Sequence, residues 1–218
     1  MILLILSECG VFGSWSLWNV PLLWLHETSV VLLLGLFTSV CVDNIEWNGT
    51  PVKKFKLLNL LIIGLLSALA IITLSILTWN VFSSVGEEIS SGGDLLAAYT
   101  TIFFATVIIA GTSTIYIFVN RASQSYFSSA YKIWISLATF FLLAYSLTSM
   151  VTTYYFTYSS SDYLFESRDS SVAAFITIEV ILNLSTVFSF ACLIKAVFIR
   201  GKNRSGETSN IKIINRAP

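Results

Sequence analysis

Charged residues are scarce in this sequence. They make up 11% of its 218 residues, against about 25% in ordinary soluble domains. Hydrophobic residues make up 56%, and the mean hydropathy is +0.81. So few charges cannot cover a water-exposed surface, and the apolar residues form long runs that a soluble core would interrupt. A water-soluble globular domain is therefore excluded, and the apolar surface must face lipid.

Groups that could hold a metal or a cofactor are also few. The chain has one histidine, His26, and three widely separated cysteines without CxxC spacing, Cys9, Cys41 and Cys192. This pattern argues against a disulfide framework and a zinc site, and it excludes haem held by two histidines. We therefore expect no metal and no cofactor.

The sequence motifs of common enzyme classes are absent as well. There is no GxSxG, HExxH, P-loop or Rossmann glycine run. The net charge of zero gives no indication of a nucleic-acid partner. These absences favour a non-enzymatic protein without catalytic residues, although an intramembrane enzyme that uses Glu179 as acid or base stays open.

Long apolar segments dominate what is present. Four of them exceed the ~20 residues that a helix needs to cross ~30 Å of hydrocarbon, at residues 57–82, 95–119, 133–156 and 172–194. Connections between them are short, and no linker divides the chain. The sequence thus predicts an all-α fold, a single polytopic transmembrane bundle over residues 1–200, followed by a basic tail without regular structure over residues 201–218.

The first 45 residues allow three interpretations. In the first, one helix covers residues 20–42 with Pro21 in its opening turn, where a missing N–H does no harm, which makes five helices. In the second, residues 1–25 form their own span, which makes six. A cleavable signal peptide is the third, although no basic residue precedes the initial apolar stretch. A chain shortened at its N-terminus would also explain this irregular start.

The basic residues predict the orientation in the five-helix arrangement. Eleven of the 12 fall at one end of the predicted bundle, with Arg168 as the exception, whereas acidic residues dominate two loops at the other end. The positive-inside rule makes the basic end cytoplasmic and puts the N-terminus outside. Asn48-Gly49-Thr50 is a formal glycosylation sequon, but it would then lie on the cytoplasmic side and stay unmodified.

Ionisable residues inside the predicted spans form the best candidate site. His26, Glu27 and Glu179 each lie ~10 Å from the same, outer end, and Asn183 lies one helical turn from Glu179. Charges in lipid are costly, so these residues predict a polar pocket in the outer half that binds a cation, a proton or a polar headgroup. The alternative is a structural role, in which Glu179 is protonated or paired and holds helices together.

A second candidate feature is the basic cluster beyond the last span, Arg200, Lys202 and Arg204. Near the membrane surface such residues attract anionic lipid by about 1 kcal/mol per charge. Simple topological anchoring explains the cluster equally well.

Two classes of function remain. The first is a membrane organiser, sensor or accessory subunit, whose partners would be membrane lipids, other membrane proteins or a second copy. The second is a small transporter or channel subunit that uses the polar pocket around Glu179. The topology resembles the last five helices of a heptahelical receptor, and a receptor remnant is a further alternative, although no receptor motif accompanies the resemblance. Segment lengths favour the plasma membrane over internal membranes.

Overall fold

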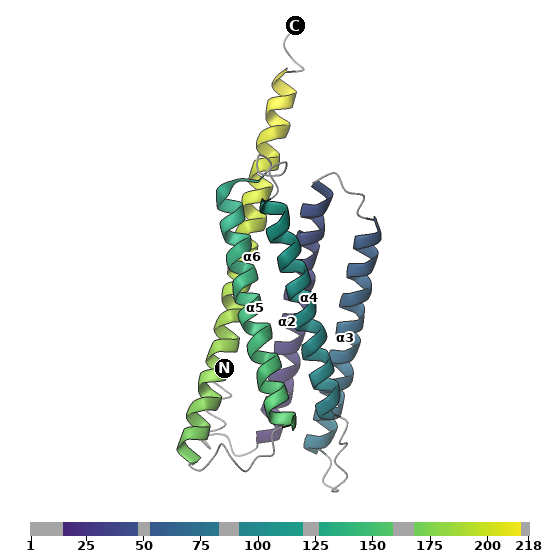
Figure 1. Ribbon diagram of the computed structural model, residues 1–218, viewed down its shortest axis with the longest axis vertical. Coiled ribbons are helices and arrows are strands. Elements are labelled where there is room, and N and C mark those ends of the chain that lie inside the picture. The colour runs from purple at the N-terminus through teal and green to yellow at the C-terminus, as the bar shows by residue number, and fades with distance from the viewer. Residues whose placement is uncertain (1–14, 48–52, 83–91, 120–126, 159–167, 215–218) are drawn as a thin grey trace.

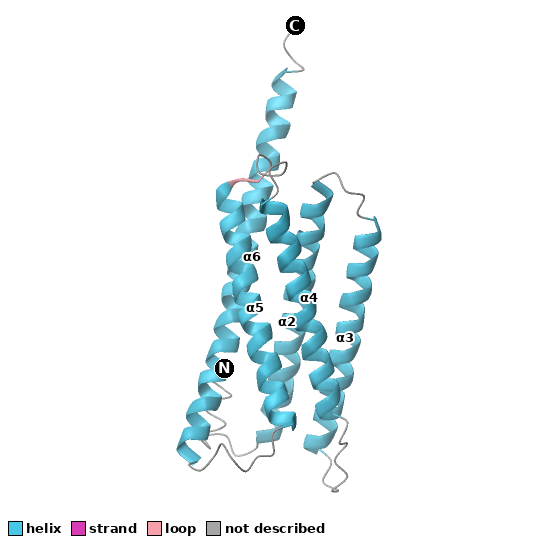
Figure 2. Cartoon of the chain, viewed as in Figure 1, coloured by secondary structure: helices cyan, strands magenta, loops and turns pink. Residues whose placement is uncertain are grey.

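A computed structural model shows an all-α chain and describes residues 15–47, 53–82, 92–119, 127–158 and 168–214. Within these ranges everything except residues 127–128 is helix, as Figure 2 shows. The helices are α2 (Trp15–Trp47), α3 (Lys53–Phe82), α4 (Gly92–Val119), α5 (Ser129–Tyr158) and α6 (Arg168–Ile214). Each of the five is long and apolar enough to cross a membrane.

The described helices lie side by side and alternate in direction along the chain (Figure 1). The most extensive contacts join α5 to α6 and α4 to α5, and α2 packs against α3, α4 and α6. Such an up-and-down arrangement follows from short connections, which leave consecutive helices antiparallel and adjacent.

Helix α2 lies closest to the centre of the bundle. In its apolar window 44% is buried, against 22% for α3, which lies at the edge (Figure 1). The buried face of α2 follows helical spacing through Val30, Leu34, Phe37, Cys41 and Asn44. In a membrane, the apolar side chains that α3 exposes would face lipid, where their exposure carries no penalty.

Many hydroxyl groups within these apolar helices are satisfied locally. The hydroxyl groups of five residues each donate to the carbonyl oxygen four residues earlier, at 2.8–2.9 Å: Thr38, Ser67, Thr106, Thr139 and Thr186. Their polar atoms therefore need neither water nor a second helix, which lets apolar spans carry many Thr and Ser residues.

The first span is one helix, as in the five-helix interpretation, and residues 1–14 lie outside the described ranges. Helix α2 begins at Trp15 and contains Pro21 in its second turn, so the proline removes one internal hydrogen bond and does not open the helix. The other helices also extend a few residues beyond the predicted spans, because hydropathy locates the apolar part of a helix and not its ends.

The largest difference concerns the tail. The sequence predicts no regular structure after Gly201, whereas the backbone of α6 continues as helix to Ile214. Extending an existing helix fixes fewer dihedral angles per hydrogen bond than nucleating a new one, and no proline interrupts residues 201–214.

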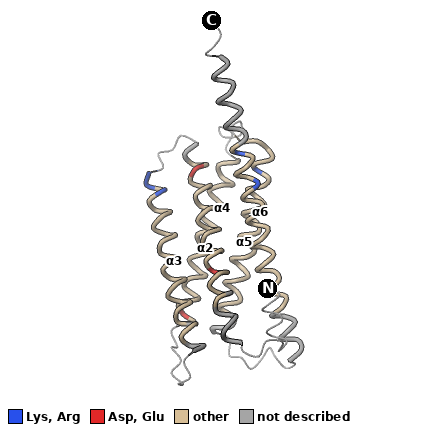
Figure 3. Tube along the Cα trace, turned by 180° about the vertical axis from the view of Figure 1, so that it is seen from behind, with Lys and Arg blue, Asp and Glu red and all other residues tan. Residues whose placement is uncertain are grey.

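Basic residues whose side chains the structure describes gather at one end, which we call the basic end (Figure 3). Three lysines, Lys53, Lys54 and Lys56, lie in the first turn of α3, Lys132 lies in the first turn of α5, and Lys195 and Arg200 lie in the last part of the apolar span of α6. Arg121 and the side chains beyond Gly201 lie outside the described residues. The clustering arises because α2, α4 and the apolar span of α6 end where α3 and α5 begin.

Candidate functional site

Two neighbouring residues of α2 contact different helices in the half of the bundle away from the basic end. The hydroxyl of Tyr99 on α4 donates to Oε2 of Glu27 at 3.0 Å. Nε2 of His26 lies 3.4 Å from the hydroxyl of Tyr145 on α5, and their ring centroids are 6.1 Å apart. A single turn of α2 thus makes polar contacts with two other helices.

The two tyrosines are held by the aromatic ring between them. Phe103 of α4 lies 6.2 Å from the ring of Tyr99 and meets the ring of Tyr145 edge to face at 5.8 Å. Only 4% of each tyrosine and 2% of Phe103 is exposed. Buried aromatic contacts of this kind restrict the rings, so the hydroxyl groups are fixed in place toward α2.

Helix α6 adds Glu179 and Asn183 on one face. Nδ2 of Asn183 donates to the backbone oxygen of Glu179 at 2.7 Å and to its Oε2 at 3.3 Å. Tyr145 lies close enough to the carboxyl groups of both Glu27 and Glu179 to interact electrostatically with them, and within hydrogen-bonding reach of Ser149. Tyr145 is therefore the residue that relates α6 to α2.

We call His26, Glu27, Tyr99, Tyr145, Glu179 and Asn183 the polar cluster. The predicted site residues His26 and Glu27 meet tyrosines of other helices, whereas Glu179 and Asn183 bond to one another. Among the described residues no hydrogen bond or ion pair joins His26 to Glu179; His26 meets Tyr145, which interacts electrostatically with Glu179. Sequence reasoning missed Tyr145, although Ser149, Thr152 and Thr153 continue its stripe along α5 at helical spacing.

A second set of polar contacts lies at the basic end. The hydroxyl of Tyr131 donates to Oδ1 of Asn44 at 2.8 Å, and Nη1 of Arg200 donates to the same oxygen at 3.4 Å. Nη1 of Arg200 also lies 3.8 Å from Oδ2 of Asp43. We call Asp43, Asn44, Tyr131 and Arg200 the basic-end cluster, and it joins α2, α5 and α6.

Arg200 therefore turns toward the bundle, although the sequence predicted it on the lipid-facing tail. Its side chain is 14% exposed, against 49% for Asp43. The side chains of Lys202 and Arg204, predicted for the same tail, lie outside the described residues. The sequence did not predict a site at Asn44, because a single asparagine near the end of a span is equally expected at the interface between lipid and water.

The two clusters differ in what they can do chemically. The polar cluster holds one histidine and two carboxyl groups, which can gain or lose a proton in the aqueous pH range. The contacts of His26 and Glu27 cross between helices. A change in proton occupancy would alter those contacts. Within the described ranges, no three His, Cys, Asp or Glu side chains gather closely enough to hold a metal ion.

In comparisons with known proteins, no family model, curated protein or solved structure matches the chain. The interpretation of function therefore rests on the two clusters.

Proposed function

We propose that this chain is a non-enzymatic, multi-pass membrane protein that acts as a proton-responsive sensing or accessory subunit, with the polar cluster as its responsive element. The observation that carries the proposal is that adjacent residues of α2, His26 and Glu27, contact α5 and α4 respectively. A change of charge on His26 acts on the interface of α2 with α5, and a change on Glu27 acts on the interface of α2 with α4.

The energetics favour such a response. An ionisable group in hydrocarbon costs ~2.5 to 3.5 kcal/mol on insertion scales, so its charge state is strongly linked to its hydrogen-bond partners. Tyr99 of α4 contacts Glu27, and Tyr145 of α5 contacts His26 and interacts electrostatically with Glu27 and with Glu179 of α6. On α3, the hydroxyl of Thr78 accepts from Trp24 at 3.1 Å. Protonation changes would therefore redistribute contacts among helices.

The orientation that accompanies this proposal puts the N-terminus outside and the C-terminus in the cytoplasm of a cell, with the plasma membrane as the favoured location. The position of Lys53, Lys54, Lys56, Lys132 and Arg200 at one end of the bundle supports it. The polar cluster would then lie in the outer half of the membrane and respond to the external medium.

Spin-label distances test the proposal. Labels at Leu25 on α2 and Val151 on α5, which are 70% and 55% exposed, would report the separation of these helices in a cysteine-free background. We expect the distance distribution at pH 5.5 to differ from that at pH 8, and His26→Gln with Glu27→Gln to abolish the difference. Asp94→Asn, which removes an exposed carboxylate at the same end, should preserve it.

A distribution that is the same at both pH values would overturn the proposal. A purely structural cluster gives a different result, in which Glu27→Gln lowers stability equally at both pH values and moves no helix. The alternative class, a transporter or channel subunit, predicts sustained proton or cation flux in proteoliposomes that is lost in Glu179→Gln. A sensing subunit shows the pH-dependent distance change without such flux.

A further inference from the structure

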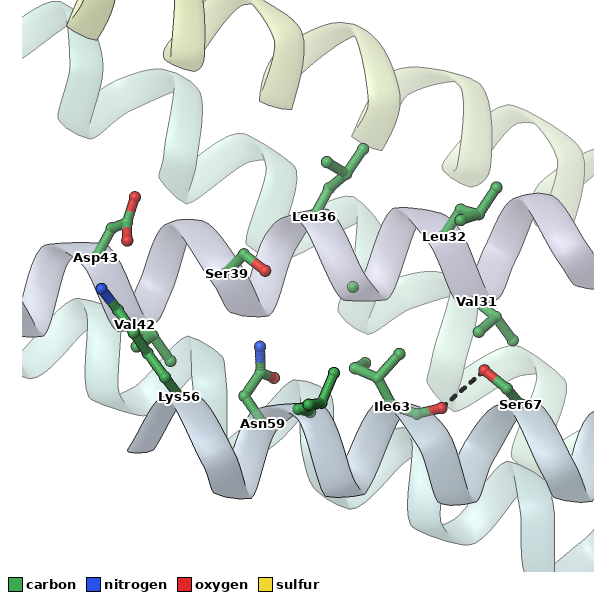
Figure 4. Close-up of a pocket in the computed structure, with 12 residues that line it drawn as sticks. Val31, Leu32, Leu36, Ser39, Val42, Asp43, Lys56, Asn59, Ile63 and Ser67 are labelled. Atoms are coloured by element: carbon green, nitrogen blue, oxygen red, sulfur yellow. Dashed lines mark hydrogen bonds between the residues drawn. The ribbon is translucent and has the colours of Figure 1, made fainter. Parts of the chain in front are cut away.

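A lateral groove lies between α2 and α3, separate from the polar cluster, and it shares Asp43 with the basic-end cluster. It encloses about 550 Å³ and runs from Val31 to Asp43 on α2, and from Lys56 to Ser67 on α3 (Figure 4). The twelve residue steps from Val31 to Asp43 span ~18 Å at ~1.5 Å per step, which is close to the ~15 Å of hydrocarbon in one leaflet. The groove thus has the length of one leaflet and ends at the basic end.

The middle of the groove lies at Gly35, where α2 presents no side chain to α3. Gly35 of α2 has no side chain, and a Cβ there would lie 3.8 Å from Cγ2 of Ile63 on α3, which is ordinary contact. Leu36 and Leu60 line the groove yet are 52% and 69% exposed, so it opens sideways from the bundle. In a membrane its opening faces lipid.

The lining is divided along its length. The part away from the basic end is mainly apolar and includes Val31, Leu32 and Ile63, whereas Ser39, Asp43, Lys56 and Asn59 gather toward the basic end. In Figure 4 Lys56 on α3 extends across toward the side of the groove where Asp43 lies on α2. This division matches a molecule with a polar head and an apolar chain.

The charges at the polar part decide which head fits. Asp43 and Lys56 line the groove, and Nη1 of Arg200 lies 3.8 Å from Oδ2 of Asp43. Lys56 supplies a cation and Asn59 an amide group at this part, and Lys53 and Lys54 lie in the same turn of α3. Cations near the membrane surface attract anionic lipid headgroups. A volume of about 550 Å³ lies within the ~300 to 1,000 Å³ of small-molecule sites.

We propose that the groove binds one anionic phospholipid, with its phosphodiester near Lys56 and Asn59 and an acyl chain along Gly35, Leu36 and Ile63. Asp43 is held by Arg200, which reduces its repulsion of the phosphate, and the positive end of the dipole of α3 lies at the same place. The proposal does not depend on the polar cluster, because it concerns other residues and the opposite half of the bundle.

Native mass spectrometry of the full chain tests this inference. The protein, in nanodiscs containing equal amounts of phosphatidylglycerol and phosphatidylcholine, should retain one phosphatidylglycerol molecule on release. Lys56→Gln should reduce that preference about fivefold, which is the factor expected for one surface charge. Lys54→Gln removes a neighbouring exposed lysine that does not line the groove, and it should leave the preference for phosphatidylglycerol unchanged.

A second pair of variants tests the apolar part. Gly35→Leu would fill the groove and should reduce retained lipid at least tenfold. Gly64→Leu adds the same side chain to α3 where a Cβ meets nothing within 4 Å, and should retain lipid as the parent does.

An equal loss of the preference for phosphatidylglycerol in Lys54→Gln and Lys56→Gln would overturn the proposal. Retention of phosphatidylcholine in preference to phosphatidylglycerol would also overturn it. If Gly35→Leu does not fold, the two lysine variants still decide the outcome, because their side chains are exposed and their substitution leaves the packing unchanged.

Discussion

The hydroxyl of Tyr99 donates to Oε2 of Glu27 at 3.0 Å and so connects α4 to α2 across 72 residues of sequence. Interhelical hydrogen bonds within membranes contribute about 0.6 kcal/mol on average and at most about 1.7 kcal/mol. The acceptor is a carboxyl group and Tyr99 is buried, so we place the bond toward the upper part of that range.

Tyr99→Phe should lower the free energy of unfolding in detergent by about 1 to 1.7 kcal/mol, because the hydroxyl is lost while the ring still packs on Phe103. A double-mutant cycle with Glu27→Leu, which removes the acceptor, measures the coupling between the two side chains. Tyr116→Phe on the same helix is the control, since Tyr116 is 71% exposed and its change should be small. Additive effects of Tyr99→Phe and Glu27→Leu would contradict the bond.

Asn44 accepts from two helices through one oxygen, while its Nδ2 is buried without a hydrogen-bond partner. Asn44→Leu leaves the donors of Tyr131 and Arg200 without their acceptor and should destabilise the bundle by about 1 to 3 kcal/mol. Asn44→Asp replaces the amide nitrogen by a second acceptor near Arg200 and should be tolerated much better. Thermal unfolding of both variants in detergent measures the difference.

For the same experiment, Asn59→Leu on α3 serves as the comparison, because Asn59 is only half-buried. If Asn44→Asp proves as destabilising as Asn44→Leu, then the oxygen of Asn44 does not join α5 and α6 to α2.

Gly111 marks the closest approach of α4 and α5. A Cβ at this position would lie 2.8 Å from Cγ2 of Thr139, whose hydroxyl donates to the backbone of Ile135 at 2.8 Å. Rotation of Thr139 would relieve the clash only by breaking that bond, so Gly111→Ala should destabilise the bundle by about 1 to 3 kcal/mol. Thermal shift in detergent is the measurement.

Gly64→Ala provides the matched control for Gly111→Ala. Its new methyl group meets nothing within 4 Å, and alanine favours the helix over glycine by about 0.8 to 1.0 kcal/mol in water. We therefore expect a neutral or slightly stabilising effect. Equal effects of the two substitutions would mean that α4 and α5 are not in close contact at Gly111.

Cys41 is enclosed by the bundle and accepts a hydrogen bond from Thr114 at 3.0 Å, with 3% of the residue exposed. In a Cys9→Ser background we expect slow maleimide labelling of the folded protein and complete labelling after denaturation in SDS, followed by intact mass. Cys192, which is 4% exposed, should behave alike, whereas a cysteine introduced by Thr28→Cys on the exposed side of α2 should react rapidly. Fast labelling of Cys41 in the fold would contradict its burial.

The proposed orientation predicts that Asn48 carries no glycan when the protein is made in mammalian cells. Glycosidase treatment should leave its gel mobility unchanged, and Asn48→Gln should migrate as the parent does. A glycosylation sequon fused ahead of Met1 supplies the positive control, because the N-terminus would be translocated. A mobility shift that depends on Asn48 would reverse the orientation.

Sequence by itself determined the class of fold, because backbone groups in hydrocarbon must be satisfied within the segment and only long apolar helices do this without partners. The four spans from residue 57 onward and the clustering of lysine and arginine at one end needed no tertiary information. Glu27 and His26 were also recognisable, since any ionisable residue inside an apolar span demands an explanation.

Only the tertiary structure decided which partners those residues meet. The sequence placed His26, Glu27 and Glu179 in one half of the bundle, whereas the packing of the helices brings Tyr145 to His26 and Tyr99 to Glu27. Rotation of each helix about its axis selects the partner, and apolar side chains on all faces leave that rotation undetermined from hydropathy alone. The groove beside Gly35 depends likewise on the separation of α2 and α3, a distance set by packing between helices and by nothing local to either one.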